Sequence, residues 1–494
     1  MMKKNIYIIL VSWTLIVQIL FNIDGPLYDL QGQFDSTWFN MGGKSLALGL
    51  KPYIDFADSK GILLWLIYAF GYVVDPYSYI GIYFVMNFVT FLTFLLGYRI
   101  ARLYMNESKS LLATVSMTIP MFYWNFYIET KSEQFCWPFV MYGLYLLLLQ
   151  LRNICDNNER RNYLLLGISI AACFFIKWSI AIMMLSFLIS TILISTKKNL
   201  IHRISFVVLG MILVSAPFLL YLSAEGCLRA FCIEYFCNTL NSVKQPISET
   251  VTSYTLELFK YFTSRKFLYL VYVLPAAMLI ERKRWFATSL PLLCMFFFLA
   301  LSARHDLGHY TTVCSPFSIV LFIVIISKIK TKMHQNLYHI CVTVLMVYIT
   351  YGSHVYKCSA LKKSESRDMC IALSNAIAKA YEKPKVNYIK IQNSIAMDRA
   401  IPSCKYWNTQ TGRSEEMWNI QMNDIMQGHA DIVFVKPGET NEEIKGILEN
   451  AGYYYITSCG GLMYSKKHIQ LPKDIKHLNP IDVIMKKHYL NIYK

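Results

Sequence analysis

The sequence predicts an α-helical integral membrane protein that carries a small soluble α/β domain at its C-terminal end. Of its 494 residues, 55% are apolar and only 16% are charged, and the mean hydropathy is +0.37. This apolar content is above that of ordinary soluble globular proteins. The apolar residues are also grouped in blocks of roughly 17–25 residues, the length that crosses a bilayer as a helix.

The first apolar block, Asn5–Phe21, follows Lys3 and Lys4 as the apolar part of a signal peptide would. No small-residue cleavage motif comes after it, so we expect it to be retained as a membrane span. Further spans are expected at 78–103, 110–127, 134–151, 162–177, 179–196, 203–222, 266–281, 285–303, 311–327 and 337–352. The prediction is therefore a membrane domain over 1–355 with about eleven transmembrane helices.

The net charge of +17 is explained by membrane topology. Lys and Arg are concentrated in alternate loops, as in the run Arg282, Lys283 and Arg284. Such loops stay on the cytoplasmic side, which predicts a cytoplasmic N-terminus and a C-terminal tail outside. A basic surface interleaved with aromatic side chains is missing from the sequence, so we expect no nucleic-acid partner.

From about Tyr356 the composition changes to that of a soluble domain, which we expect to span 356–494. A helical pattern over 364–381 precedes two strand-like segments, VNYIKIQ and DIVFVKP. A second helix is predicted over 441–451, and YYYITSCGGLMYSKK is typical of a hairpin. The pairing of the tail cysteines is left open; these are Cys358, Cys370, Cys404 and Cys459.

The first outer loop, 23–77, gathers charge at the membrane surface. Asp35, Asp55, Asp58 and Lys60 fall within one short segment, where charges are costly unless they bind something. Asp35 suits the N-cap of an amphipathic interfacial helix over 36–50, and the apolar stretch 61–74 predicts a second one. A carboxylate fixed there can accept a proton or hold a cation against phosphate, and capping alone is the alternative.

Further polar residues fall on the same predicted side of the membrane. Lys177 interrupts the apolar segment ACFFIKWSIAI, and with Lys60 it suits a phosphate unless both ammonium groups only reach for the interface. Glu133 opens a span, where it either complements the helix dipole or faces Asp35. In ARHDLGHYTT, Arg304 suits a leaving phosphate, with His309 and Tyr310 as hydrogen-bonding neighbours.

These residues point to one outer cavity that combines carboxylates with cations beside lipid. Such a cavity suits a substrate with a phosphate head and a long apolar tail, as polyprenyl-phosphate sugars have, because cations there stabilise the charge left on the lipid phosphate. The thirteen cysteines form no CxxC pair and no zinc-type cluster with His. We therefore assign no metal ligands and no certain cofactor, and leave a divalent cation open.

The order of these motifs resembles the bacterial GT-C glycosyltransferases, the superfamily of the protein O-mannosyltransferases and the lipid A aminoarabinose transferase. The resemblance is carried by FDSTWF, GLKPYIDFADSK, SEQFCWPFVMYGLYLL, GISIAACFFIKWS and GHYTTVCSPFSIVL, and by the tail DIVFVKPGE…ILENAGYYYI. It implies a polyprenyl-phosphate sugar donor, inverting transfer outside the cytoplasm and, because the tail is similar to bacterial relatives, a bacterial inner membrane.

The same resemblance assigns roles to single positions. It implies that Asp35 is the first-loop catalytic acid, that Glu133 is the second acid, and that Lys60 and Lys177 contact phosphate. Ser36 stands where many relatives have a second acid, which weakens a metal-bridging role for the loop. Lys60-Gly61-Ile62 also replaces the Lys-Pro-Pro of several relatives, so the local turn is expected to differ.

The sugar and the acceptor, whether lipid, glycan or protein, are not specified by the sequence. A transporter or flippase of a lipid-linked sugar would use similar cations but would be expected to show inverted repeats, which we do not find. A surface-polysaccharide polymerase or ligase would be expected to concentrate its catalytic residues in a late outer loop. Here the first outer loop is the richest in charge, which favours the transferase.

Overall fold

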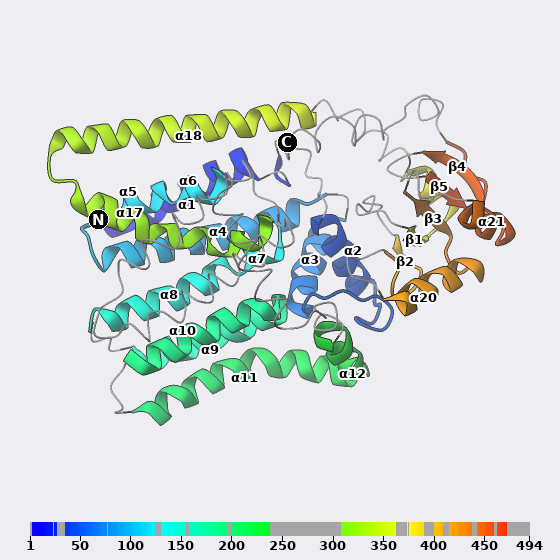
Figure 1. Cartoon of the computed structure of the whole chain (residues 1–494), viewed down its shortest axis with the longest axis horizontal. Coiled ribbons are helices and arrows are strands. Elements are labelled where there is room, and N and C mark those ends of the chain that lie inside the picture. The colour runs from blue at the N-terminus through cyan, green and yellow to red at the C-terminus, as the bar shows by residue number, and fades with distance from the viewer. Residues whose placement is uncertain are drawn as a thin grey trace, which may run out of the picture.

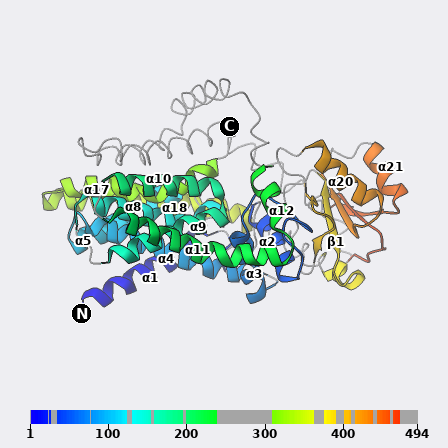
Figure 2. The ribbon, with the colours of Figure 1, turned by 90° about the horizontal axis from the view of Figure 1, so that it is seen from below.

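The chain divides into a helical bundle and a small α/β unit, with helices α2 and α3 between them (Figure 1). The computed structural model describes residues 2–22, 24–26, 35–76, 78–123, 130–154, 158–194, 199–237, 308–361, 373, 375–389, 400–408, 414–436, 442–458 and 462–471. The N-terminus lies at the end of the bundle farthest from the α/β unit (Figure 1). Seen from below, α2, α3 and α12 again separate the two parts (Figure 2).

The described helices of the bundle follow one another along the chain with short connections. They are α1 (Met2–Phe21), α2 (Asp35–Ala47), α3 (Ile62–Val74), α4 (Ile80–Arg102), α5 (Glu107–Ser116), α6 (Thr118–Tyr123), α7 (Ser132–Phe135), α8 (Trp137–Leu151), α9 (Glu159–Ile176), α10 (Trp178–Ile194), α11 (Leu200–Ala224), α12 (Leu228–Phe231), the π-helical turn η2 (Cys232–Cys237), the 3₁₀ segment η5 (Gly308–Ser318), α17 (Ile319–Lys328) and α18 (Lys332–Leu361).

The outer surface of the bundle is apolar. On α11, Ile201 and Leu220 are 85% and 70% exposed, and α18 likewise exposes Leu337, Val344 and Val347. A soluble protein would place few such side chains in contact with water over so wide an area. An apolar exterior around helices whose own backbone groups are hydrogen-bonded is the arrangement that a bilayer requires.

The predicted number of spans is only partly supported. Among the described residues, α4 and α11 are long and apolar enough to cross a bilayer, with 23 and 25 residues. Shorter apolar helices lie at Asn5–Phe21, Ile62–Val74, Trp137–Leu151, Trp178–Ile194, Thr312–Lys328 and Asn336–Tyr351. The predicted span 110–127 is divided between α5 and α6, and the spans 266–281 and 285–303 lie outside the described residues.

Basic side chains from separate loops meet at the end of the bundle that also holds the N-terminus. The Lys109 ammonium donates to the carbonyl of Ile329 at 3.2 Å, which joins the start of α5 to the end of α17. The Arg152 guanidinium, after α8, lies 4.9 Å from the ring centroid of Tyr104. The alternating basic loops are therefore gathered at one end, as the positive-inside pattern expects.

The first outer loop folds into two packed helices, α2 and α3, close to the predicted ranges 36–50 and 61–74. Gly43 allows the two helices to approach. A Cβ atom at Gly43 would lie 2.4 Å from the Tyr68 Cβ and 2.6 Å from the Ala69 nitrogen. Any larger residue would push α2 away from α3, so this glycine sets the spacing of the loop helices.

The C-terminal unit is built on a five-stranded sheet with the order β2-β1-β3-β5-β4. Its elements are β1 (Lys385–Ile389), β2 (Ile401–Pro402), α20 (Glu415–Met426), β3 (Ile432–Val435), α21 (Glu442–Asn450), β4 (Tyr454–Ser458) and β5 (Leu462–Ser465). β1 pairs in parallel with β2 and β3, and β5 pairs antiparallel with β3 and β4. The predicted strands, the helix over 441–451 and the hairpin are confirmed, while the domain boundary at 356 stays a prediction.

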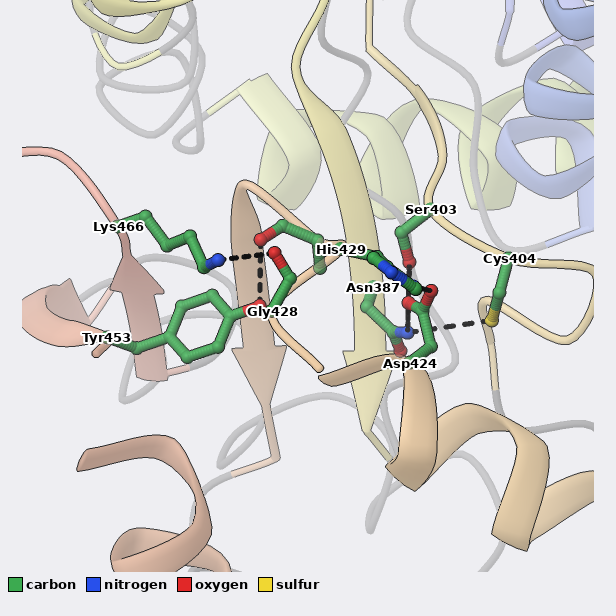
Figure 3. Close-up of polar contacts among 9 residues, drawn as sticks. Asn387, Ser403, Cys404, Asp424, Gly428, His429, Tyr453 and Lys466 are labelled. Carbon is green, nitrogen blue, oxygen red and sulfur yellow. Dashed lines mark hydrogen bonds and ion pairs between the residues drawn. The ribbon is translucent and has the colours of Figure 1, made fainter. Parts of the chain in front are cut away.

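A buried polar network fixes the chain that follows β2 (Figure 3). The Asp424 carboxylate on α20 accepts hydrogen bonds from Asn387 Nδ2 at 3.2 Å and from Ser403 Oγ at 2.6 Å. Gln421 Nε2 donates to Asn387 Oδ1 at 2.6 Å, so the amide is held from both sides. Buried polar groups satisfied in this way stabilise one conformation. Cys404, next in the chain, is a free thiol, and the other three tail cysteines lie outside the described side chains.

The segment Ser403–Asn408 docks the α/β unit onto the bundle. Lys405 Nζ lies 2.5 Å from Glu234 Oε1 on η2, and the Tyr406 hydroxyl donates to the same oxygen at 2.7 Å. The Ala57 amide of the first loop donates to the Lys405 carbonyl at 3.0 Å. Three bonds from one short segment therefore tie the α/β unit to two separate parts of the bundle.

Glu234→Ala should weaken this docking. The substitution leaves the buried Tyr406 hydroxyl and the Lys405 ammonium without their shared acceptor, which we expect to cost about 1–3 kcal/mol. Thermal unfolding of the full chain in detergent measures the loss. Glu225→Ala is the matched control, because Glu225 forms an exposed ion pair with Lys51 and such pairs contribute little. Equal losses in the two variants would contradict the docking role.

Candidate active site

Glu133 and Lys177, predicted from separate motifs, form a buried ion pair. Glu133 lies on the short helix α7 with a side chain only 2% exposed, and the Lys177 ammonium contacts its Oε1 atom. Ser132 Oγ donates to the other carboxylate oxygen at 2.9 Å. Lys177 itself is 13% exposed and lies between α9 and α10, where the backbone turns extended (φ −154°, ψ 105°). The break between the two helices is what turns this lysine toward α7.

Gly61 brings the first outer loop against the end of α9. Its amide donates to the Ile176 carbonyl at 3.1 Å, one residue before Lys177. A Cβ atom at Gly61 would lie 2.0 Å from the Phe175 carbonyl oxygen, so only glycine fits at this approach. The departure from Lys-Pro-Pro noted in the sequence therefore has a structural reason, because this position needs both a free amide and the absence of a side chain.

Lys60 precedes this glycine and faces the loop helix α2. Its ammonium is 5.5 Å from the centroid of the Phe39 ring, and its carbonyl accepts from the Tyr53 hydroxyl at 2.9 Å. Asp58 turns back on its neighbour and accepts from the Ser59 amide at 2.5 Å and the Ser59 hydroxyl at 3.2 Å. Asp58 thus has a local structural role, and its part in donor binding stays a prediction.

Asp35 is the first residue of α2, whereas the prediction placed it just before the helix. Its charge is felt at Lys131, a residue to which sequence reasoning assigned no role. Burial lowers the pKa of Lys131, and the carboxylates of Asp35 and Glu133 oppose this, while the Lys177 ammonium adds to it. The two predicted acids and the predicted cation therefore lie around a second lysine that directly precedes α7.

Asp24 is a further acid that sequence reasoning did not single out. It is fully buried beyond the end of α1, where its Oδ2 atom accepts from the Thr130 amide at 3.3 Å and from the Thr130 hydroxyl. Burial raises the pKa of this carboxyl to about 7, although the Thr130 hydrogen bonds and the Lys131 charge act in the opposite direction. A possible signal was its position directly after a span, in NIDGP.

The late-span cluster is only partly described. Arg304 lies outside the described residues, and His309 and Tyr310 are described in their backbone alone, at the start of η5. η5 packs against α6, α7 and α8, and Trp137 Nε1 donates to the Thr312 carbonyl at 2.7 Å. The backbone therefore brings this segment beside the helix that carries Glu133. The roles of the three side chains stay predictions.

Within the described ranges, no group of three or more His, Cys, Asp or Glu side chains could hold a metal ion. The acids of this region instead contact hydrogen-bond donors or ammonium groups, as Glu133 does with Ser132 and Lys177. The chemistry of these residues fits an anionic ligand and proton transfer.

Comparison with known proteins agrees with this arrangement. Residues 62–221 match the family model of dolichyl-phosphate-mannose-protein mannosyltransferase. ArnT from Cupriavidus metallidurans bound to undecaprenyl phosphate matches with a TM-score of 0.60 and 9% identity, over 93% of this chain and 98% of that one. Its apo state matches with a TM-score of 0.60 and 10% identity, over 94% and 99%. The chain belongs to the GT-C superfamily. A comparison with curated protein sequences finds no match.

The GT-C assignment confirms the family resemblance and the general fold, a helical membrane protein with a small sheet at its C-terminal end. The family model covers the chain from α3 to α11, and so includes Glu133, Lys131 and Lys177. Asp24, Asp35 and Lys60 lie before the matched segment. Their place in the site is supported by the packing of α2 on α3 and by the Gly61 contact.

Breaking the ion pair on one side should be more harmful than removing it altogether. Glu133→Leu leaves the Lys177 ammonium buried without this counter-ion, and Lys177→Met does the same to Glu133. We expect each to lose about 3–5 kcal/mol of stability, and the double variant to recover most of it because neither charge is then desolvated. Thermal unfolding in detergent tests this. Losses that simply add in the double variant would rule out the pairing.

Asp24→Asn should change how stability depends on pH. The folded Asp24 carboxyl has a pKa of about 7 against an ordinary 3.8, so between these values the folded state holds a proton that the unfolded state releases. Wild-type stability from this group therefore falls as pH rises from about 4 to about 7, while asparagine does not titrate. Melting temperatures of both proteins at pH 5 to 8 should show the wild type losing ground. A constant difference would contradict the raised pKa.

Proposed function

We propose that this GT-C protein is a glycosyltransferase that moves a sugar from a polyprenyl-phosphate-linked donor to an acceptor outside the cytoplasm, with inversion at the sugar. The observation that carries the proposal is the contact of Gly61 with the end of α9. It joins the loop that bears Lys60 to the chain that bears Lys177, and Lys177 in turn binds Glu133. Carboxylates and ammonium groups are thus gathered at one place within a lipid-facing fold.

Inverting transfer is a direct displacement, so the roles divide in a simple way. Asp35 accepts the proton of the acceptor hydroxyl or amine, or orients it toward the anomeric carbon. The lipid phosphate leaves from the opposite face with the electron pair of the broken bond. Lys60, Lys177 and Arg304 stabilise its negative charge, which is the electrostatic contribution that the reaction most needs. Asp58, His309 and Tyr310 are proposed to contact the donor.

The ion pair refines the role of Lys177. A lysine held by Glu133 can share its three N–H donors between this carboxylate and an incoming phosphate. Glu133 would then fix the ammonium and, at the same time, orient the sugar or the acceptor. Because Ser132 already donates to the other carboxylate oxygen, the geometry of Glu133 is set before the substrate binds.

The donor class is supported by the relative with the same fold, since ArnT has been observed bound to undecaprenyl phosphate. The apolar outer faces of α11 and α18 are compatible with a lipid that enters from the bilayer. We further propose a bacterial cytoplasmic membrane, with the basic end of the bundle inside and the site and the α/β unit outside. Neither the sugar, hexosyl or pentosyl, nor the acceptor is specified.

Asp35→Asn should abolish sugar transfer while folding and membrane insertion stay intact. The amide keeps the size of the side chain but cannot accept the acceptor's proton, and general-base catalysis typically contributes about 100- to 10,000-fold in rate. The measurement is release of sugar from a panel of radiolabelled polyprenyl-phosphate sugars by the purified protein. The panel also identifies the sugar.

Asp55→Asn is the control from the same loop, because the exposed Asp55 accepts a hydrogen bond from the Lys51 amide at 2.7 Å and belongs to a turn. This variant should retain activity. Normal turnover by Asp35→Asn would refute its role as base. A wild-type protein that moves the labelled lipid across vesicles without releasing sugar would point instead to a flippase.

A further inference from the structure

Asp24 and Thr130 join the end of α1 to the start of α7. Both side chains are fully buried, and one carboxylate oxygen accepts two hydrogen bonds, from the amide and the hydroxyl of Thr130. The Tyr68 hydroxyl on α3 donates to the Thr130 carbonyl at 2.5 Å. Every polar group of Thr130 is therefore held, by α3 on one side and by the end of α1 on the other.

The acid at this joint is itself anchored by a chain of buried polar side chains. The Asp24 amide donates to Asn22 Oδ1 at 2.9 Å, and Asn22 Nδ2 donates to Gln18 Oε1 at 2.8 Å. Gln18 Nε2 donates in turn to Thr90 Oγ1 on α4 at 2.6 Å. Buried polar groups among apolar helices are costly and mark functional places in membrane proteins. The Oδ1 atom of Asp24 is buried without a hydrogen-bond partner.

The residue that this joint places is Lys131. It follows Thr130 directly and opens α7, where its amide donates to Gln134 Oε1 at 3.1 Å. Glu133, two residues further on, contacts Lys177. The partly buried Lys131 ammonium is thus the second ammonium beside this pair, and it lies within the electrostatic reach of Asp24, Asp35 and Lys177.

We propose that Lys131 is a further phosphate-binding cation of the site and that Asp24 positions it through Thr130. The inference rests on the proposed function. A polyprenyl-phosphate sugar is a phosphodiester with one negative charge, and its product is a phosphate monoester with a higher charge. A compact ammonium in a partly desolvated site is well suited to stabilise this gain.

The position of Lys131 also gives it a role in the order of events. Before the donor binds, its charge neutralises that of Asp35. When the phosphate arrives, the ammonium turns to it, and Asp35 becomes available as a base. The acceptor oxygen then forms its bond to the anomeric carbon, the bond to the phosphate oxygen breaks, its electron pair stays on the phosphate, and the acceptor proton moves to Asp35.

Lys131→Met tests the binding role, because methionine keeps the length of the side chain and removes the charge. Binding of undecaprenyl phosphate to the purified full chain should weaken roughly tenfold or more, as loss of a hydrogen bond to a charged group predicts. Binding of the uncharged alcohol undecaprenol should not change. Lys131→Arg should retain most of the binding, and Lys328→Met, an exposed lysine at the basic end, should match the wild type.

The positioning role of Asp24 needs a separate readout. Thr130→Val removes the hydroxyl that Asp24 accepts from at nearly constant volume, and Thr130→Ser restores it. We expect the valine variant to raise the KM for the donor more than it lowers kcat, and the serine variant to bring KM back. A merely structural role would lower the amount of folded enzyme without changing KM. Lys131→Gln replaces Lys131→Met if the latter does not fold.

The outcomes separate this inference from the function on which it rests. A wild-type protein that binds no undecaprenyl phosphate overturns both. A wild type that binds it and releases sugar, together with a Lys131→Met variant that binds equally well, overturns the inference alone. Selective loss of phosphate-lipid binding in Lys131→Met, with undecaprenol binding unchanged and Lys131→Arg active, supports it.

Discussion

The approach of the first outer loop to the end of α9 is the constraint on which the candidate site depends. Gly61 has room for no side chain, and its amide is bonded to the last turn of α9. Through this contact the loop that carries Lys60 is fixed relative to Lys177, and Lys177 is fixed relative to α7 by Glu133. A backbone contact of this kind is more rigid than one between flexible lysine side chains, so it can hold several charges in a preorganised arrangement.

Charge balance explains why so many ionisable groups are tolerated so near an apolar bundle. Each described acid of the site has a compensating partner, since Glu133 contacts Lys177 and Asp24 accepts from Thr130. Lys131 stands between the two and is influenced by both. A substrate phosphate that entered this cluster would find ammonium groups already ordered by carboxylates. Such preorganisation reduces the reorganisation that the reaction itself must drive.

The sequence predicted the elements of the site better than their pairing. Lys177 was recognisable because a charge interrupts an apolar run, and the two loop helices followed from their periodicity. The Glu133–Lys177 contact joins residues 44 positions apart, and one sequence holds no signal for such a contact. Asp24 and Lys131 were missed because their importance comes from burial, which only the tertiary structure reveals. The span count was overestimated relative to what helix length supports, because apolar runs such as 110–127 break into shorter helices.

The α/β unit extends the same constraint from the far side of the first loop. Its segment Ser403–Asn408 accepts a hydrogen bond from the Ala57 amide, three residues before Lys60, and places Trp407 against Trp38 of α2 with ring centroids 5.8 Å apart. The loop is therefore held between α9 on one side and the soluble unit on the other. Because the same segment is fixed by the buried Asp424 network, a disturbance inside the α/β unit would reach the loop through Ser403. The soluble unit is thus a structural part of the site, whatever acceptor it selects.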